Sequence, residues 1–127
     1  MCNEDNTCCL ANTLQTIIKL QNNDNYCDIQ DGCDKPFLGP TPSLVSYNTR
    51  PISLYNCFNG DLWSFPTGNV TSTVFRAEAI DDCCLTCRVL IDNGDDSYTS
   101  TNDFFTINLK CVCAMQCHND VFIDLTI

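Results

Sequence analysis

The sequence predicts a mainly β protein, an antiparallel β-sandwich or barrel of about six strands that follows a short N-terminal amphipathic helix. Residues 43–127, the expected β domain, are rich in the Thr, Val, Phe and Ile residues that are typical of strands. Turn signals divide this part into short segments, and no helical segment is expected between them. Closely spaced strands with short turns favour antiparallel pairing.

The helix is expected from Cys8 to Asn22, within a cysteine-bearing N-terminal arm and helix that spans residues 1–25. Apolar side chains recur at i, i+4, i+7 and i+8, so that one stripe forms from Leu10, Leu14, Ile17 and Ile18. Residues 26–42 contain several Gly and Pro residues and predict an irregular connector between the helix and the β domain.

Turn residues set the limits of the expected strands. Asn59-Gly60 is a strong hairpin signal, because both residues tolerate a positive φ. Asp81-Asp82 ends another strand, and the polar, acidic stretch 92–103 predicts a loop. The expected strands lie between these turns, at residues 52–58, 62–65, 70–80, 83–91, 104–117 and 121–127.

Twelve cysteines occur in the 127 residues, and strand alternation predicts which way several of them point. Alternate residues of a strand face opposite sides of the sheet. In segment 104–117 the odd positions are all apolar or sulfur-bearing, and segment 83–91 has a similar apolar face. We therefore expect five sulfurs to face the core as thiols or intrachain bridges: Cys83, Cys87, Cys111, Cys113 and Cys117.

Other cysteines are expected at the surface. Cys57 has the same parity as Ser53 and Tyr55, opposite to Leu54, and Cys84 lies on the outer face of its strand. Exposed thiols without a partner in their own chain suit links between chains. The candidate inter-subunit disulfides are formed by Cys2, Cys8, Cys9, Cys57 and Cys84.

The charge and the apolar runs exclude several functions. Sixteen acidic and six basic residues give a net charge of −10, which a nucleic acid or an anionic membrane would repel. Apolar runs are too short for membrane insertion, and an acidic start without an apolar core indicates no signal peptide. We therefore expect synthesis in a reducing cytosol, followed by use where thiols oxidise or bind metal.

The chemical alternatives are a redox pair and a zinc site. Cys84 and Cys87 have C-x-x-C spacing, but a redox pair needs a helix N-terminus and this segment continues as a strand. The cysteines of segments 83–87 and 111–117, with His118, could supply a tetrahedral zinc site, although one of these segments is a regular strand. We expect no metal, no cofactor and no enzyme activity, and we interpret Arg76 and Glu78 as a structural ion pair.

Several segments occur in an order that resembles a known family. They are Thr49-Arg50-Pro51 with Leu54-Tyr55, Phe75-Arg76-Ala77-Glu78, Asp81-Asp82 before Cys84, Arg88-Val89-Leu90, and the tail from Leu109 to Cys117. Together they resemble the spore coat protein Y/Z family of Bacillus endospores, which includes the ExsY-like exosporium proteins. The similarity covers residues 36–127, and the tail is its most specific part.

This resemblance implies a structural protein that self-assembles into a two-dimensional array cross-linked by disulfides. The expected partners are other copies of the chain and other spore coat or exosporium proteins. The protein would be made in the mother-cell cytosol, packed around the forespore and oxidised later at the spore surface. An alternative within the same group is an adaptor that anchors appendages or a glycoprotein layer to the exosporium. A zinc- or redox-handling module is the second alternative.

Overall fold

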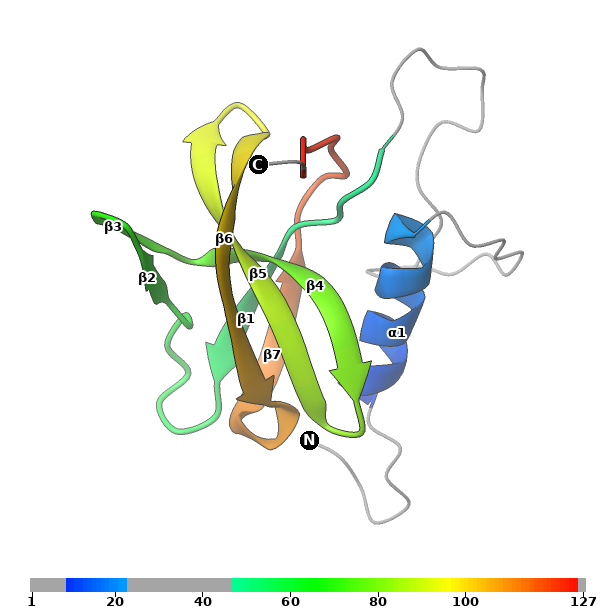
Figure 1. Cartoon of the computed structure of the whole chain (residues 1–127). Helices are drawn as coiled ribbons and strands as arrows, with labels where there is room; N and C mark the ends of the chain where they lie inside the picture. Colours follow the sequence, from blue (N-terminus) through cyan, green and yellow to red (C-terminus); the bar gives the residue numbers. More distant parts are fainter. Residues whose placement is uncertain (1–8, 23–46, 126–127) are drawn as a thin grey trace.

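The computed structural model describes residues 9–22 and 47–125, which form one helix, seven strands and a short 3-10 helix (Figure 1). In chain order the elements are α1 (Cys9–Gln21), β1 (Ile52–Asn56), β2 (Phe65–Thr67), β3 (Val70–Ser72), β4 (Val74–Asp81), β5 (Cys84–Gly94), β6 (Ser97–Asn108), the 3-10 helix η2 (Leu109–Cys111) and β7 (Val112–Cys117).

Five of the strands form one antiparallel sheet in the order β6-β5-β4-β1-β7, and β2 and β3 form a separate hairpin. Helix α1 lies beside β4 at one side of the sheet (Figure 1). The predicted fold class is confirmed: the fold is mainly β, antiparallel and preceded by one short helix. The large sheet remains open, so the architecture is closer to a sandwich than to a barrel.

The helix lies where the apolar stripe predicted it. Leu14 and Ile17 are fully buried, and Leu10 and Ile18 pack at the edge of the same core. The sheet contributes Phe75 and other apolar side chains of β1, β4 and β5 to this core. Burial of one face of α1 therefore fixes the helix on the sheet. The predicted start at Cys8 and the connector 26–42 lie outside the described residues.

The expected loop at residues 92–103 is wrong, because most of it is strand. β5 continues to Gly94 and β6 begins at Ser97, so that only Asp95 and Asp96 form the turn. Their φ values are 54° and 58°, and Asp is one of the few residue types that enter this left-handed region readily. The Ser and Thr residues that follow extend the β6 ladder despite their polarity.

The expected single strand at residues 104–117 is also wrong. Asn108 Oδ1 accepts a hydrogen bond from Lys110 N (2.9 Å) and begins η2, which separates β6 from β7. β6 pairs with β5, whereas β7 lies at the far edge of the sheet beside β1. The side-chain alternation therefore does not continue unbroken from Phe105 to Cys117.

An aromatic cluster covers the part of the sheet near β6. The Phe105 ring stacks on Phe65 at 4.8 Å between centroids and meets Phe75 edge-on at 4.9 Å. Trp63 contacts the same ring, with centroids 6.1 Å apart. The Asn59-Gly60 turn is present, with Gly60 at a φ of 74° and its N–H bonded to Asn56 O, but the strand expected at residues 62–65 is reduced to one bridge between Tyr55 and Leu62.

Candidate cross-linking surface at one end of the sheet

Most described cysteines lie at one end of the sheet, the lower end in Figure 1. Helix α1 begins there, β1 and β6 end there, and β5 and β7 begin there, because antiparallel neighbours alternate in direction. We call this end of the sheet the cysteine end. It carries six of the eight described cysteines: Cys9, Cys57, Cys83, Cys84, Cys111 and Cys113.

Cys57 and Cys113 form a disulfide within the chain, with Cα atoms 4.9 Å apart and a sequence separation of 56. The structure thus corrects the expectation that Cys57 links subunits. Strand alternation ends at Asn56, because residues 57–59 form a turn and Cys57 N donates to Cys111 O (2.8 Å).

Cys113 forms an intrachain bridge, one of the two states expected for it, but the expected orientation toward the core is wrong. The ladder between β1 and β7 shifts its register between Tyr55 and Asn56, which pair with Ala114 and Val112. Cys113 therefore lies at a β-bulge and is exposed, while Val112 takes the buried position. Alternation within one expected strand could not predict an inserted residue.

Four described cysteines are free. Cys9 and Cys84 are exposed, Cys111 is partly exposed in η2, and Cys87 is fully buried in β5. Cys84 and Cys87 lie on opposite faces of β5, an arrangement that separates the two thiols of the C-x-x-C spacing. Burial raises the pKa of the Cys87 thiol well above its ordinary value, and the carboxylate of Glu78 raises it further.

Cys83 and Cys117 are disulfide-bonded as well, and both side chains pack at the edge of the core. Cys83 O also accepts a hydrogen bond from Leu109 N (2.7 Å), which ties the start of η2 to the β4–β5 turn. Within the described ranges, 9–22 and 47–125, no three His, Cys, Asp or Glu side chains are grouped as metal ligands. The arm cysteines Cys2 and Cys8 lie outside those ranges.

His118 contacts a buried hydroxyl that the sequence did not indicate. Its Nε2 lies 2.8 Å from Ser53 Oγ, and the same hydroxyl donates to Thr73 O at 3.0 Å. Because a hydroxyl carries one proton, the imidazole N–H is then the donor to Ser53. In that tautomer His118 holds β1 to the segment after β7 and does not accept a proton from Ser53.

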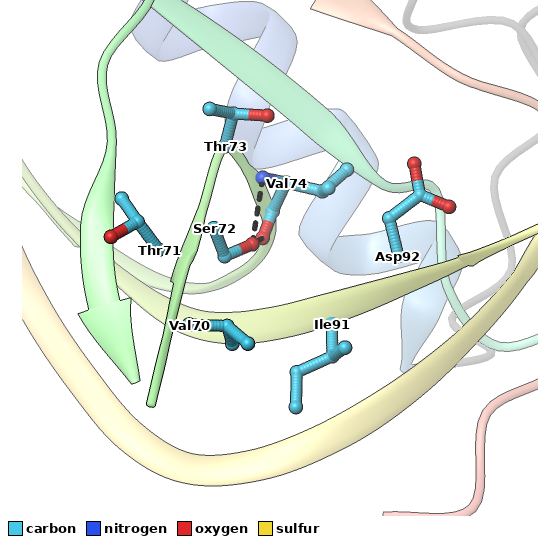
Figure 2. A pocket seen from close by; sticks show the side chains of 7 residues that line it. All are labelled: Val70, Thr71, Ser72, Thr73, Val74, Ile91 and Asp92. Atoms are coloured by element: carbon cyan, nitrogen blue, oxygen red, sulfur yellow. Dashed lines mark hydrogen bonds between the residues drawn. The ribbon is translucent and has the colours of Figure 1, made fainter. Parts of the chain in front are cut away.

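A surface pocket lies between β3 and β5 (Figure 2). Figure 2 shows Thr71, Thr73 and the carboxylate of Asp92 around it, together with apolar side chains. The hydroxyl of Ser72 is already used, since it donates to Leu90 O and accepts from Val74 N at 3.2 Å. A single carboxylate and two threonines form no cluster of reactive or metal-binding groups.

Charged side chains form two structural networks. Arg76 Nη1 lies 2.7 Å from Glu78 Oε2, so the expected ion pair is present, and Arg88 Nε shares that oxygen at 3.1 Å. The second network joins Arg50 to Asp120, and no sequence pattern predicts it. Arg50 binds Asp120 through two hydrogen bonds of 2.7 and 3.0 Å, although 70 residues separate them.

A comparison with models of protein families identifies a match. A family model described as Spore coat protein Z matches residues 1–103, from the N-terminal arm into β6. Neither the curated proteins nor the solved structures include a significant match. The match includes residues 1–35, which the sequence resemblance did not cover, and ends before the cysteine-rich tail 109–117. None of the described segments forms a helix of the length and apolarity that crossing a membrane requires.

Proposed function

Because the chain belongs to the spore coat protein Z family and is a structural protein of the spore coat, we propose that its copies assemble into a disulfide-cross-linked layer. Subunits made in the mother-cell cytosol associate while their thiols are reduced. Disulfides between neighbouring subunits then form as the spore envelope becomes oxidised. The layer resists dissociation because several bonds at each subunit must break together.

The single observation that supports this proposal is the pair of exposed free thiols at the cysteine end. Cys9 at the start of α1 and Cys84 at the start of β5 are both exposed and unbonded. Two such thiols on one subunit allow covalent links to two neighbours, which join subunits into chains, and further links or non-covalent contacts in a second direction extend the chains into a layer. We propose the same role for Cys2 and Cys8 on the N-terminal arm.

The experiment compares disulfide-linked multimers after the reduced full-length protein has assembled and been oxidised. Cys9→Ser with Cys84→Ser is expected to lower the linked fraction on a non-reducing gel several-fold, although the arm thiols Cys2 and Cys8 remain. Cys87→Ala is the matched control, since it removes a free but buried thiol and should leave the linked fraction unchanged. Adding Cys2→Ser and Cys8→Ser tests the arm.

Two outcomes would contradict the array. If the quadruple serine variant cross-links as fully as the wild type and resists boiling in detergent equally, the exposed thiols do not join the subunits. If the oxidised wild-type protein stays monomeric by electron microscopy and binds another coat protein, the adaptor alternative replaces the array. A soluble monomer that carries stoichiometric zinc would favour the metal-binding alternative.

A further inference from the structure

A third cysteine lies beside the Cys57–Cys113 disulfide. Cys111 is free, and its carbonyl oxygen accepts the hydrogen bond from Cys57 N at 2.8 Å. Hydrogen-bonded residues of antiparallel backbones hold their Cα atoms about 5.5 Å apart. A disulfide spans Cα separations of about 4.4–6.8 Å, so Cys57 is within bridging distance of Cys111 as well as Cys113.

Cys111 is also open to solvent. Its side chain is partly exposed and lines a surface pocket of about 220 Å³ together with Asn56, Phe58 and Trp63. Phe58 at the rim is 86% exposed, and Trp63 Nε1 is buried without a hydrogen-bond partner among the described residues. A small reagent can therefore reach this thiol, and the thiol can lose its proton to water.

We propose that Cys57, Cys111 and Cys113 form a thiol–disulfide exchange site. The Cys111 thiol releases its proton to solvent, and the thiolate attacks Cys57 Sγ. A Cys57–Cys111 bond forms while the Cys57–Cys113 bond breaks, and its electron pair leaves on Cys113 Sγ, which takes up a proton. One thiol and one disulfide are present before and after the exchange, so no oxidant or reductant is needed.

The exchange moves the free thiol from a partly exposed position to an exposed one. Cys111 lies in η2 beside the pocket, whereas Cys113 lies at the bulge of β7, the outermost strand of the sheet. A thiol released there can reach a neighbouring subunit. Its use for cross-linking rests on the proposed function, but the exchange itself does not, since it takes place within one chain.

The test uses the full-length oxidised protein, kept dilute, free of oxygen and mildly alkaline, with iodoacetamide added at intervals. Mass spectrometry of fragments then reports the alkylation of each cysteine. We expect label on Cys111 in some molecules and on Cys113 in others, with a rate independent of protein concentration. Cys111→Ser should lower the labelling of Cys113 about tenfold or more, because the attacking group is gone.

Two further variants keep the test specific. Cys84→Ser removes another exposed thiol of the cysteine end and should leave the labelling of Cys113 unchanged. In Cys113→Ser, Cys57 should stay protected from alkylation because it bridges to Cys111. Trp63, the one tryptophan of the chain, lines the same pocket as Cys111. Its fluorescence should therefore change as the disulfide moves from Cys113 to Cys111.

The exchange site is rejected by any of three results. These are equal labelling of Cys113 in the wild type and in Cys111→Ser, a labelling rate that rises with protein concentration, and alkylation of Cys57 in Cys113→Ser. Cross-linked sheets without label transfer would reject the exchange and leave the array intact. Label transfer in a protein that never assembles would reject the array alone.

Discussion

At the scale of single residues, one buried ion pair joins the segment before β1 to the segment after β7, which lie side by side at one end of the sheet. Arg50 precedes β1 and Asp120 follows β7, and their side chains are only 3% and 6% exposed. The two hydrogen bonds form the bidentate geometry in which a guanidinium binds a carboxylate most strongly. Removing one member of such a pair leaves a charge in a place that water cannot reach.

Asp120→Asn is therefore expected to lower the free energy of unfolding by about 3–5 kcal/mol, the usual cost of breaking a buried pair from one side. Urea denaturation monitored by circular dichroism measures the loss. Asp61→Asn serves as the control, because Asp61 is exposed and forms no ion pair in the described structure. A loss below about 0.5 kcal/mol in Asp120→Asn would show that the pair contributes little stability.

The second residue-scale prediction concerns the two thiols of the C-x-x-C spacing. Cys84 is exposed, whereas Cys87 is buried and its pKa is raised by burial and by Glu78. Maleimide should therefore modify Cys87 about a hundredfold more slowly than Cys84 in the folded protein, and at a similar rate in denaturant. Stopped-flow labelling followed by mass spectrometry measures both rates, and equal rates in the folded protein would contradict the burial.

The raised pKa of Cys87 also predicts how stability depends on pH. In the unfolded chain the thiol ionises near its ordinary pKa of about 8.5, whereas in the folded protein it keeps its proton to a higher pH. The unfolded state therefore loses the proton first, and the free energy of unfolding falls as the pH rises above that value. In Cys87→Ala, the part of this decrease that is due to the Cys87 thiol should be absent when the free energy of unfolding is measured by denaturation at alkaline pH.

At the scale of elements, one buried side chain joins the helix to the sheet. Gln21 at the end of α1 donates from Nε2 to Ala77 O (2.7 Å) in β4, and its Oε1 accepts from Arg50 N (3.1 Å). Gln21 is only 4% exposed. If its side chain were removed, water could therefore not replace its hydrogen bonds to the two backbone groups. The two hydrogen bonds of the Gln21 amide thus fix the angle at which α1 packs on the sheet.

Gln21→Ala should lower the free energy of unfolding by about 2–3 kcal/mol, because it leaves two buried backbone groups without hydrogen bonds. Gln15→Ala on the exposed side of α1 is the matched control and should change stability by less than about 0.5 kcal/mol. Chemical denaturation of both variants gives the comparison. Equal effects would mean that α1 is held by its apolar stripe alone.

The elements that sequence reasoning predicted well depend on local patterns. Helix α1 and the Asn59-Gly60 turn follow from an apolar stripe and from turn residues that lie next to one another. The predicted strand boundaries were wrong at two places where the hydrophobic pattern does not show the end of a strand. A single Asn108 cap interrupts residues 104–117, and the Asp95–Asp96 turn is tight enough to leave room for strand on both sides.

The candidate site was less predictable than the fold. Alternation described the face of each cysteine only while one strand continued, which held for Cys84 and Cys87 in β5. It assigned the wrong face to Cys113 and could not predict the bridge to Cys57, because a bulge and a turn place these residues and the pairing of β1 with β7 joins them. Strand order decides such contacts, and strand order is a property of the whole chain.

At the scale of the whole molecule, the two ends of the sheet differ in chemistry. The cysteine end carries the exposed and partly exposed free thiols, whereas the turn between β5 and β6 lies at the opposite end (Figure 1). That turn and its flanks are acidic and exposed, with Asp92, Asp95 and Asp96 within five residues. The subunit thus has one end suited to covalent links and another that repels copies of itself.

This repulsion predicts that salt controls non-covalent assembly. The net charge of −10 acts across about 30 Å at 0.01 M salt but only about 8 Å at 0.15 M. Raising the salt concentration under reducing conditions should therefore speed assembly several-fold, as measured by light scattering.

Replacing Asp92, Asp95 and Asp96 by Asn keeps their shapes, removes three charges and should reproduce the effect of high salt at low salt. The exposed Ser97→Asp adds a charge and should slow assembly. Slower assembly at high salt would instead mean that subunits associate through opposite charges.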